Sequence, residues 1–270
     1  MEFSNKYIMG FTLILCLVCA MGVSATAVGL KPLQDANKLL FKQKNVLLAS
    51  GAIRSGEKVS SAKITELFGQ INQVIIDQKT GRIVEGDPES IDTVKLAKDP
   101  ETSEATPREF RRTMVKRISK QLLAYEVDIT GLRKLKGLPA DDESADSIQC
   151  LVIPIQGNGL WGPMFGFIAL TSNAKEVLGI TYYQHKETPG LGGEVDNPSW
   201  KALWPGKIAL DETGQPLIRV VKAGAVKNPD YEVDGMSGAT ITSNSVTNML
   251  HLWLGDAAFG PYLQTKIGVQ

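Results

Sequence analysis

Apolar residues in this chain form one long run near the N-terminus, followed by shorter runs separated by charged and turn-forming residues. Residues 7–30 carry no charged side chain, and these 24 positions suffice for a helix to cross a hydrocarbon core of about 30 Å. The pattern predicts one transmembrane anchor, placed in residues 1–32. The alternative is a secretory signal peptide cleaved after Ala27, but the run exceeds the usual apolar length of about 7 to 15 residues.

Farther along, the spacing of apolar residues predicts both helices and strands. Apolar residues with interspersed lysines over residues 39–48 predict an amphipathic helix that packs on a core rather than on lipid. Residues 73–77 and 82–84, joined by a turn at residues 78–81, predict a β-hairpin. Further strands are predicted near Ile148, Phe165, Val177 and Leu217, and further helices near Ile118 and Leu250.

These elements predict an α+β fold class, in which a single N-terminal transmembrane helix is followed by a mixed α/β domain packed in layers. Prolines among acidic and hydroxyl residues predict a loop at residues 85–108. An acidic stretch at residues 140–146 precedes an apolar run of strand length at residues 148–155. We therefore divide the rest of the chain into a membrane-proximal and middle region, residues 33–145, and a C-terminal domain, residues 146–270.

Composition and charge narrow the functional class. The 270 residues are 43% hydrophobic, which is enough for a sizeable core, and 29 basic side chains balance 29 acidic ones. A broad basic face is therefore not expected, which argues against nucleic acid as a partner. Cys16 and Cys19 lie in the predicted anchor and Cys150 stands apart, so no disulfide framework or thiolate metal site is predicted. The two histidines, His185 and His251, are too few for a histidine-rich metal site.

The most informative motif is a short turn, Asp234-Gly235-Met236-Ser237-Gly238-Ala239-Thr240, that leads into a segment with helical spacing of apolar residues. Thr240 is therefore expected just upstream of a helix N-terminus. Unpaired N–H groups and the positive end of the helix dipole favour a phosphate there. Gly235 and Gly238 allow the backbone to approach closely. The alternative is an ordinary helix start capped by Ser237, Thr240, Thr242 or Ser243.

This turn resembles the acceptor sequence Asp-Gly-x-Ser-Gly-Ala-Thr of FMN-binding domains in which FMN is joined through its phosphate to the final threonine. The resemblance implies covalent FMN on Thr240. Two earlier segments match the same domain in the same order: a glycine-aromatic turn at residues 157–162 and a Glu-Thr-Pro-Gly-Leu-Gly turn at residues 187–192. Backbone amides and hydroxyls in such turns can bond the ring atoms of a flavin.

The resemblance also implies a set of cofactor-binding residues in addition to Thr240. They are Asp234, Gly235, Ser237, Gly238, Ala239 and Thr242 in the acceptor turn, Leu160, Trp161 and Gly162 in the first segment, and Glu187, Thr188, Gly190, Leu191 and Gly192 in the second. Taken alone, each segment has a structural alternative, because Trp161 could pack in a core and the glycines could simply make tight turns. No catalytic acid or base and no metal ligand is predicted.

Over essentially its full length the chain resembles the C subunit of the Na+-translocating NADH:quinone reductase, with an N-terminal span, a Lys-Asn-Val-Leu segment after it and the acceptor motif near the C-terminus. The resemblance implies an electron-carrier subunit of a respiratory translocase that relays electrons from NADH to ubiquinone, together with the A, B, D, E and F subunits. It also implies a separate flavin transferase, because the Thr240 hydroxyl is a weak nucleophile with no Ser-His-Asp arrangement around it.

Two signals conflict over the side of the membrane. Lys31, Lys38, Lys42 and Lys44 follow the span and only Lys6 precedes it, so the positive-inside rule alone places the following domain in the cytoplasm. The resemblance implies the opposite, a single-pass protein of the bacterial inner membrane with its domain on the periplasmic side. We adopt the second interpretation because the motif match is more specific than a few lysines.

Two other functions fit part of the pattern. The G subunit of an Rnf-type electron transport complex has the same anchor and acceptor motif but is a shorter chain. From a different functional class, a membrane-anchored binding or assembly protein would keep the Ser-Gly-Ala-Thr turn unmodified. Flavin absorbance that survives denaturation distinguishes covalent attachment from this last alternative.

Overall fold

The computed structural model describes residues 4–136 and 150–268, which fall into two compact units divided after Lys42. Helix α1 (Asn5–Ala49) begins in the first unit and ends in the second. Among the described residues it is the one helix long and apolar enough to cross a membrane. Its last turns bury Val46 and Leu47 in the second unit. The amphipathic helix predicted at residues 39–48 is therefore the end of α1 and not a separate element.

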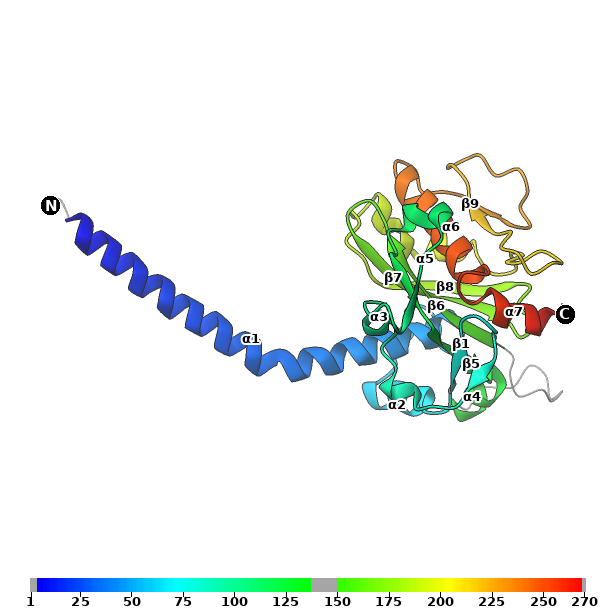
Figure 1. Ribbon diagram of the computed structural model, residues 1–270, viewed down its shortest axis with the longest axis horizontal. Coiled ribbons are helices and arrows are strands. Elements are labelled where there is room, and N and C mark those ends of the chain that lie inside the picture. Colours follow the sequence, from blue (N-terminus) through cyan, green and yellow to red (C-terminus); the bar gives the residue numbers. More distant parts are fainter. Residues whose placement is uncertain (1–3, 137–149, 269–270) are drawn as a thin grey trace. The chain divides into compact units, whose positions relative to one another are not determined.

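The second unit is built on a six-stranded sheet with the order β2-β1-β5-β6-β7-β8, in which all neighbours are antiparallel (Figure 1). The strands are β1 (Asn72–Asp77), β2 (Ile83–Val84), β5 (Gln121–Val127), β6 (Cys150–Asn158), β7 (Pro163–Thr171) and β8 (Val177–Gln184). The predicted hairpin of β1 and β2 is confirmed. The acidic stretch at residues 140–146 and the boundary drawn after residue 145 lie outside the described residues.

One predicted helix is wrong. Ile118 lies in strand β4 (Arg117–Ser119), and the residues that follow it form β5. Because β5 lies between β1 and β6 and is buried on both faces, its apolar run lacks the alternation that marks a half-exposed strand. Only the pairing of distant segments identifies such a strand.

Shorter elements complete the second unit. The helices are α2 (Ser61–Phe68), α3 (Thr93–Leu96), α4 (Ile129–Leu135), α5 (Pro198–Lys201), α6 (Thr240–Leu254) and α7 (Gly260–Ile267), with 3-10 turns η1 (Pro88–Ser90), η2 (Arg108–Thr113) and η3 (Gly192–Asp196). Strand β3 (Ser103–Ala105) pairs with β4, and β9 (Arg219–Val220) pairs in parallel with β10 (Glu232–Val233). The loop predicted at residues 85–108 therefore contains η1, α3 and β3.

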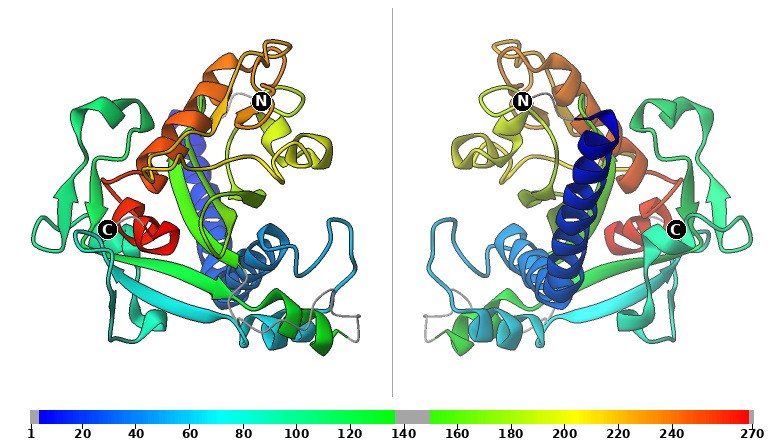
Figure 2. Two further views of the ribbon diagram at one scale, coloured as in Figure 1. Left: turned by 90° about the vertical axis from the view of Figure 1, so that its right-hand side faces the viewer. Right: turned by 90° about the vertical axis from the view of Figure 1, so that its left-hand side faces the viewer.

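Helices cover both faces of the sheet. On one face α6 packs along β6, and its apolar residues join a core that includes Ile180 of β8 (Figure 2). Neighbouring residues of a strand point to opposite faces, and on the other face Thr181 Oγ1 donates to the Asn45 carbonyl oxygen at 3.2 Å. Gly179 is required there, because a Cβ atom would lie 2.6 Å from the carbonyl oxygen of Ala49. The end of α1 therefore seals the face opposite α6.

A buried carboxylate fastens α7 to the sheet. Glu126, at the end of β5, is 5% exposed and accepts hydrogen bonds from Tyr262 Oη and Lys266 Nζ, each at 2.9 Å. It also accepts one from Asn72 Nδ2 at 2.9 Å. Burial and the neighbouring carboxylate raise the pKa of Tyr262, so its phenol remains a hydrogen-bond donor at neutral pH. Every oxygen of this buried acid is thus engaged.

Replacing Glu126 with alanine is expected to lower the free energy of unfolding by about 3 kcal/mol, because it leaves Tyr262 and Lys266 without their buried partner. Urea unfolding of the full chain in detergent, followed by circular dichroism, measures the change. The exposed Glu212 offers a matched control, for which Glu212→Ala should change stability by less than about 0.5 kcal/mol. Equal losses in the two variants would contradict a clamp at Glu126.

Candidate functional site

Three segments that are distant in the sequence meet around one pocket of about 300 Å³. They are the turn between β6 and β7, the segment after β8, and the start of α6 with the turn before it. The predicted residues that line the pocket are Leu160, Trp161, Glu187, Thr188, Leu191, Gly192, Gly238, Ala239, Thr240 and Thr242. The structure brings the three predicted segments together, and the binding role of these residues stays a prediction at this point.

The start of α6 forms one wall of the pocket. Thr240 is the first residue of the helix and is exposed, so the helix begins earlier than the apolar spacing indicated. The N-cap is Ala239, and no side chain caps the helix. Neither Thr242 nor Ser243 caps the helix. The Thr242 hydroxyl donates to Glu187, and the Ser243 hydroxyl accepts the backbone N–H of Met236. The alternative of an ordinary capped start is wrong, and the first-turn N–H groups and the helix dipole favour an anion beside Thr240.

Glu187 connects all three segments. This side chain is 5% exposed, and its Oε1 accepts the backbone N–H of Trp161 at 2.9 Å. Its Oε2 accepts the hydroxyl of Thr242 in a short hydrogen bond. Two glycines leave the space that the carboxylate occupies: a Cβ atom would lie 2.5 Å from Oε1 at Gly159 and 2.4 Å from Oε2 at Gly192. The glycines of these turns therefore serve the packing of one buried acid.

Exposed apolar side chains form the rim of the pocket. Trp161 is 64% exposed, so it does not pack in the core as a tryptophan usually does. Leu160, Leu191 and Ile241 are also large, exposed and part of the lining. Ile241 was not predicted from the sequence as a pocket residue. The available signal was an apolar residue directly after Thr240 that does not lie on the buried face of α6. A cluster of exposed apolar residues around a pocket is typical of a binding site.

Five predicted cofactor residues do not line the pocket. They are Gly162, Gly190, Asp234, Gly235 and Ser237. Asp234 supports the acceptor turn, because its Oδ1 accepts the Gly224 N–H at 2.7 Å and its carbonyl oxygen accepts Trp200 Nε1 at 2.8 Å. Gly235 lets the turn pass close to β9, since a Cβ atom would lie 2.2 Å from the carbonyl oxygen of Val221. Asp234 and Gly235 thus shape the turn rather than contact the pocket.

Both histidines are engaged in local hydrogen bonds. His185 Nε2 lies 2.8 Å from Asp196 Oδ2, and His185 Nδ1 accepts the Glu187 N–H at 3.2 Å, which closes the loop after β8 on itself. His251 Nε2 donates to the Ile218 carbonyl oxygen at 2.9 Å. No group of three potential metal ligands occurs among residues 4–136 and 150–268.

Comparisons with known proteins identify the family. The FMN-binding domain family matches residues 159–255, which contain all three segments of the pocket. The C subunit of the Na(+)-translocating NADH-quinone reductase from Vibrio vulnificus is 41% identical over 261 residues, covering 96% of this chain and 94% of the relative. The chain belongs to the family of these C subunits. The Pseudomonas aeruginosa C subunit is 38% identical over 257 residues, covering 93% of this chain and 92% of the relative.

Solved structures of C subunits share this fold. The crystal structure of Shewanella oneidensis NqrC is similar with a TM-score of 0.70 at 25% identity, covering 87% of this chain and 99% of that one. The C subunit from Parabacteroides distasonis has a TM-score of 0.62 at 24% identity, covering 88% and 96%, and supports the fold alone. The predicted α+β class, one long apolar N-terminal helix followed by a mixed α/β domain, is confirmed.

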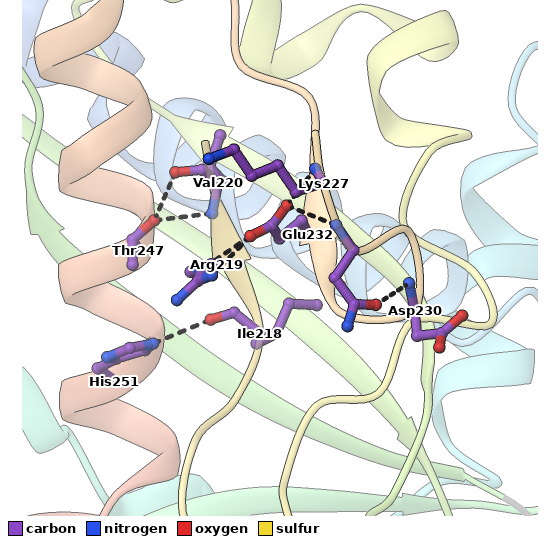
Figure 3. Close-up of polar contacts among 9 residues, drawn as sticks. Ile218, Arg219, Val220, Lys227, Asp230, Glu232, Thr247 and His251 are labelled. Atoms are coloured by element: carbon purple, nitrogen blue, oxygen red, sulfur yellow. Dashed lines mark hydrogen bonds and ion pairs between the residues drawn. The ribbon is translucent and has the colours of Figure 1, made fainter. Parts of the chain in front are cut away.

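In this member of the C-subunit family, a second polar network holds the segment that leads into the acceptor turn (Figure 3). Glu232 of β10 accepts hydrogen bonds from Arg219 Nη2 at 2.6 Å and from the backbone N–H groups of Lys227 and Asn228 at 2.7 and 2.9 Å. The Asn228 N–H, the Arg219 guanidinium and the Lys227 N–H lower the pKa of Glu232 from 4.5 to about 2. The carboxylate therefore fastens β9, β10 and the loop between them.

Helix α6 is joined to the same network. Thr247 Oγ1 accepts the Val220 N–H at 2.8 Å (Figure 3). Burial lowers the pKa of His251, which keeps its ring neutral at pH 7 for the hydrogen bond to Ile218. Helix α6, which follows the acceptor turn, is thus bonded to β9, and β9 pairs with β10, the strand that leads into the turn; these bonds help to determine where the turn lies.

Replacing Glu232 with glutamine is expected to lower the thermal unfolding temperature at neutral pH. The folded-state pKa of about 2 lies below the ordinary 4.5, so the carboxylate stabilises the fold fully above about pH 4.5 and loses this effect as the pH falls towards 2. The difference between the wild-type chain and Glu232→Gln should therefore shrink across that interval in thermal scans. A difference that stays constant with pH, or one matched by the exposed control Glu212→Gln, would contradict the assignment.

Proposed function

We propose that this chain carries FMN joined through its phosphate to Thr240 and passes electrons within the Na+-translocating NADH:quinone reductase of a respiratory chain. The observation that carries the proposal is the exposed Thr240 at the uncapped start of α6, on a pocket rimmed by apolar side chains. Family membership supports the coarser statement that the chain contains an FMN-binding domain and is a subunit of an oxidoreductase complex.

The residues of the pocket fit both ends of FMN. The phosphate end would lie at the first-turn N–H groups of α6, where the helix dipole would offset its charge and where Gly238, with φ of +74°, lets the backbone turn sharply. The apolar side chains of Leu160, Trp161 and Leu191, which are exposed to solvent, would hold the ring end. A volume of about 300 Å³ is at the lower end of ligand pockets, so part of the ring would remain accessible to an electron partner.

When bound, FMN supplies the electron transfer, and a phosphate linkage leaves its ring unmodified for that purpose. The chain's own residues would hold the cofactor and exclude water from one side of it. Glu187 is the ionisable side chain among the residues that line the pocket, and its oxygens are engaged by Trp161 and Thr242. The pocket therefore offers no free base to activate the Thr240 hydroxyl, which supports attachment by a separate flavin transferase.

The proposed partners follow from the same function. The chain would act with the A, B, D, E and F subunits in a relay that runs from NADH through FAD and iron–sulfur centres to ubiquinone. Electron flow through the complex would be coupled to sodium export. A sodium path through this chain itself is not supported, because residues 7–30 of its apolar helix carry no charged side chain.

Two alternatives are weighed against this proposal. The full-length similarity to C subunits favours the sodium-pump family over the G subunit of an Rnf-type complex. An unflavinylated binding or assembly protein would have the same fold but no use for an exposed hydroxyl beside an apolar pocket. Whether Thr240 carries covalent flavin distinguishes this binding or assembly protein from the proposed function.

Replacing Thr240 with alanine is expected to abolish covalent flavin while leaving the fold intact, because the exposed hydroxyl is the attachment point and contributes little to packing. The full chain is expressed beside a flavin transferase, and intact mass with peptide mapping is measured. Wild type should gain the mass of one FMN less one water on the Thr240 peptide, and Thr240→Ser should keep part of it.

Ser237→Ala is the matched control, since this hydroxyl lies in the same turn, is exposed and does not line the pocket. It should keep full modification. Covalent FMN on Thr240→Ala, or its absence from wild type, would sink the proposed function.

We also propose that the chain is a single-pass protein of the bacterial inner membrane with its folded unit on the periplasmic side. A C-terminal alkaline phosphatase fusion, which is active only outside the cytoplasm, should then be active. A C-terminal green fluorescent protein fusion, which matures inside, should be dark. The reverse result would restore the cytoplasmic placement that the lysines after the span indicate.

A further inference from the structure

Glu187 is an isolated negative charge in a pocket whose other lining residues are uncharged. It takes part in none of the ion pairs formed among the described residues. The side chain of the adjacent Lys186 is exposed and runs beside Gly162. Its aliphatic carbons lie 3.5 Å or more from the position that a Cβ atom would take at Gly162. His185 is engaged with Asp196 at 2.8 Å. The buried carboxylate is therefore balanced by hydrogen bonds and not by a cation.

Two hydrogen-bond donors face the Glu187 carboxylate. Both oxygens accept, one from the Trp161 backbone N–H and the other from the Thr242 hydroxyl. The backbone N–H of Trp161 can only donate a hydrogen bond. Through these two hydrogen bonds one side chain holds the β6–β7 turn against the first turn of α6.

We propose that Glu187 has two separable roles: its shape and hydrogen bonds position the three pocket segments, and its unpaired charge makes the pocket less favourable for added electrons. The second role rests on the proposed function, because it concerns FMN bound at Thr240. The first concerns this chain alone.

The charge role follows from electrostatics in a partly buried site. Each electron that the donor subunit passes to a bound ring adds one negative charge, unless a proton follows it. A fixed carboxylate in the lining of the pocket opposes that charge, and water screens it less there than at an exposed surface. Glu187 would therefore lower the midpoint potential of the flavin, which favours passing electrons onward over retaining them.

Two substitutions separate charge from position. Glu187→Gln keeps the shape and both bonds, because the amide oxygen can accept the Trp161 N–H while the amide nitrogen donates to Thr242 Oγ1. It removes only the charge. Glu187→Asp keeps the charge but is one carbon shorter, so it cannot reach both partners at once. Each variant therefore changes one role and leaves the other.

The experiment combines a redox titration of the FMN-loaded full chain with thermal unfolding of the FMN-free chain. The titration uses alkaline buffer, where fewer protons follow the electrons. Glu187→Gln should raise the midpoint potential, with about a tenfold higher ratio of reduced to oxidised flavin at a fixed potential, or about 30 mV for a two-electron couple. Its unfolding temperature should match wild type. Glu187→Asp should lower the unfolding temperature and leave the potential near that of wild type.

Glu194→Gln is the control, because Glu194 belongs to the same loop and accepts Asn197 Nδ2 at 2.5 Å but does not line the pocket. It should leave the potential unchanged. An unshifted potential in Glu187→Gln, or failure of that variant to load FMN, overturns the charge role. An unfolding temperature that Glu187→Asp leaves unchanged overturns the positioning role. Unmodified Thr240 in wild type defeats the proposed function instead, and the unfolding comparison still tests the positioning role.

Discussion

The packing of α6 on β6 is the contact on which the rest of the site depends. Gly157 lets the helix approach, since a Cβ atom there would lie 2.5 Å from Met249 Cγ. One turn later Trp253 Nε1 donates to the Gln156 carbonyl oxygen at 2.6 Å. Both contacts are made just before the β6–β7 turn, so burial of the apolar face of α6 also sets how far Thr240 lies from Trp161. The pocket is the space that this packing leaves.

A polar connection keeps that space open. Apolar side chains such as Leu160 and Leu191 would gain by collapsing against each other, yet they remain exposed around the pocket. In our proposal Glu187 prevents the collapse, because its two hydrogen bonds hold the segments at a fixed spacing and Gly159 and Gly192 leave room for it. The same side chain brings an unpaired charge into the pocket. Shape and electrostatics of the site thus depend on one residue.

Two other polar networks of the second unit support this arrangement from a distance. Glu232 and Arg219 hold the strands that lead into the acceptor turn, and Glu126 fastens the helix that follows α6. Three buried acids, Glu232 in β10, Glu187 in the loop after β8 and Glu126 in β5, therefore position the start, the wall and the far end of the α6 region. For an electron carrier such rigidity is useful, because a cofactor held in one place needs little rearrangement when its charge changes.

Local patterns determined a good part of this protein. The uncharged run of residues 7–30, the β1–β2 hairpin and the order of the three glycine-containing turns can all be inferred from neighbouring residues, because span length, turn chemistry and motif spacing are local properties. Tertiary structure decided the rest. It made the segment after Ile118 a central strand, turned Ile241 towards the pocket, withdrew Asp234 from it and joined Glu187 to Thr242. Each of these outcomes depends on which distant segments pack together, and strand pairing and shared burial between distant segments leave no periodic signal in the chain itself.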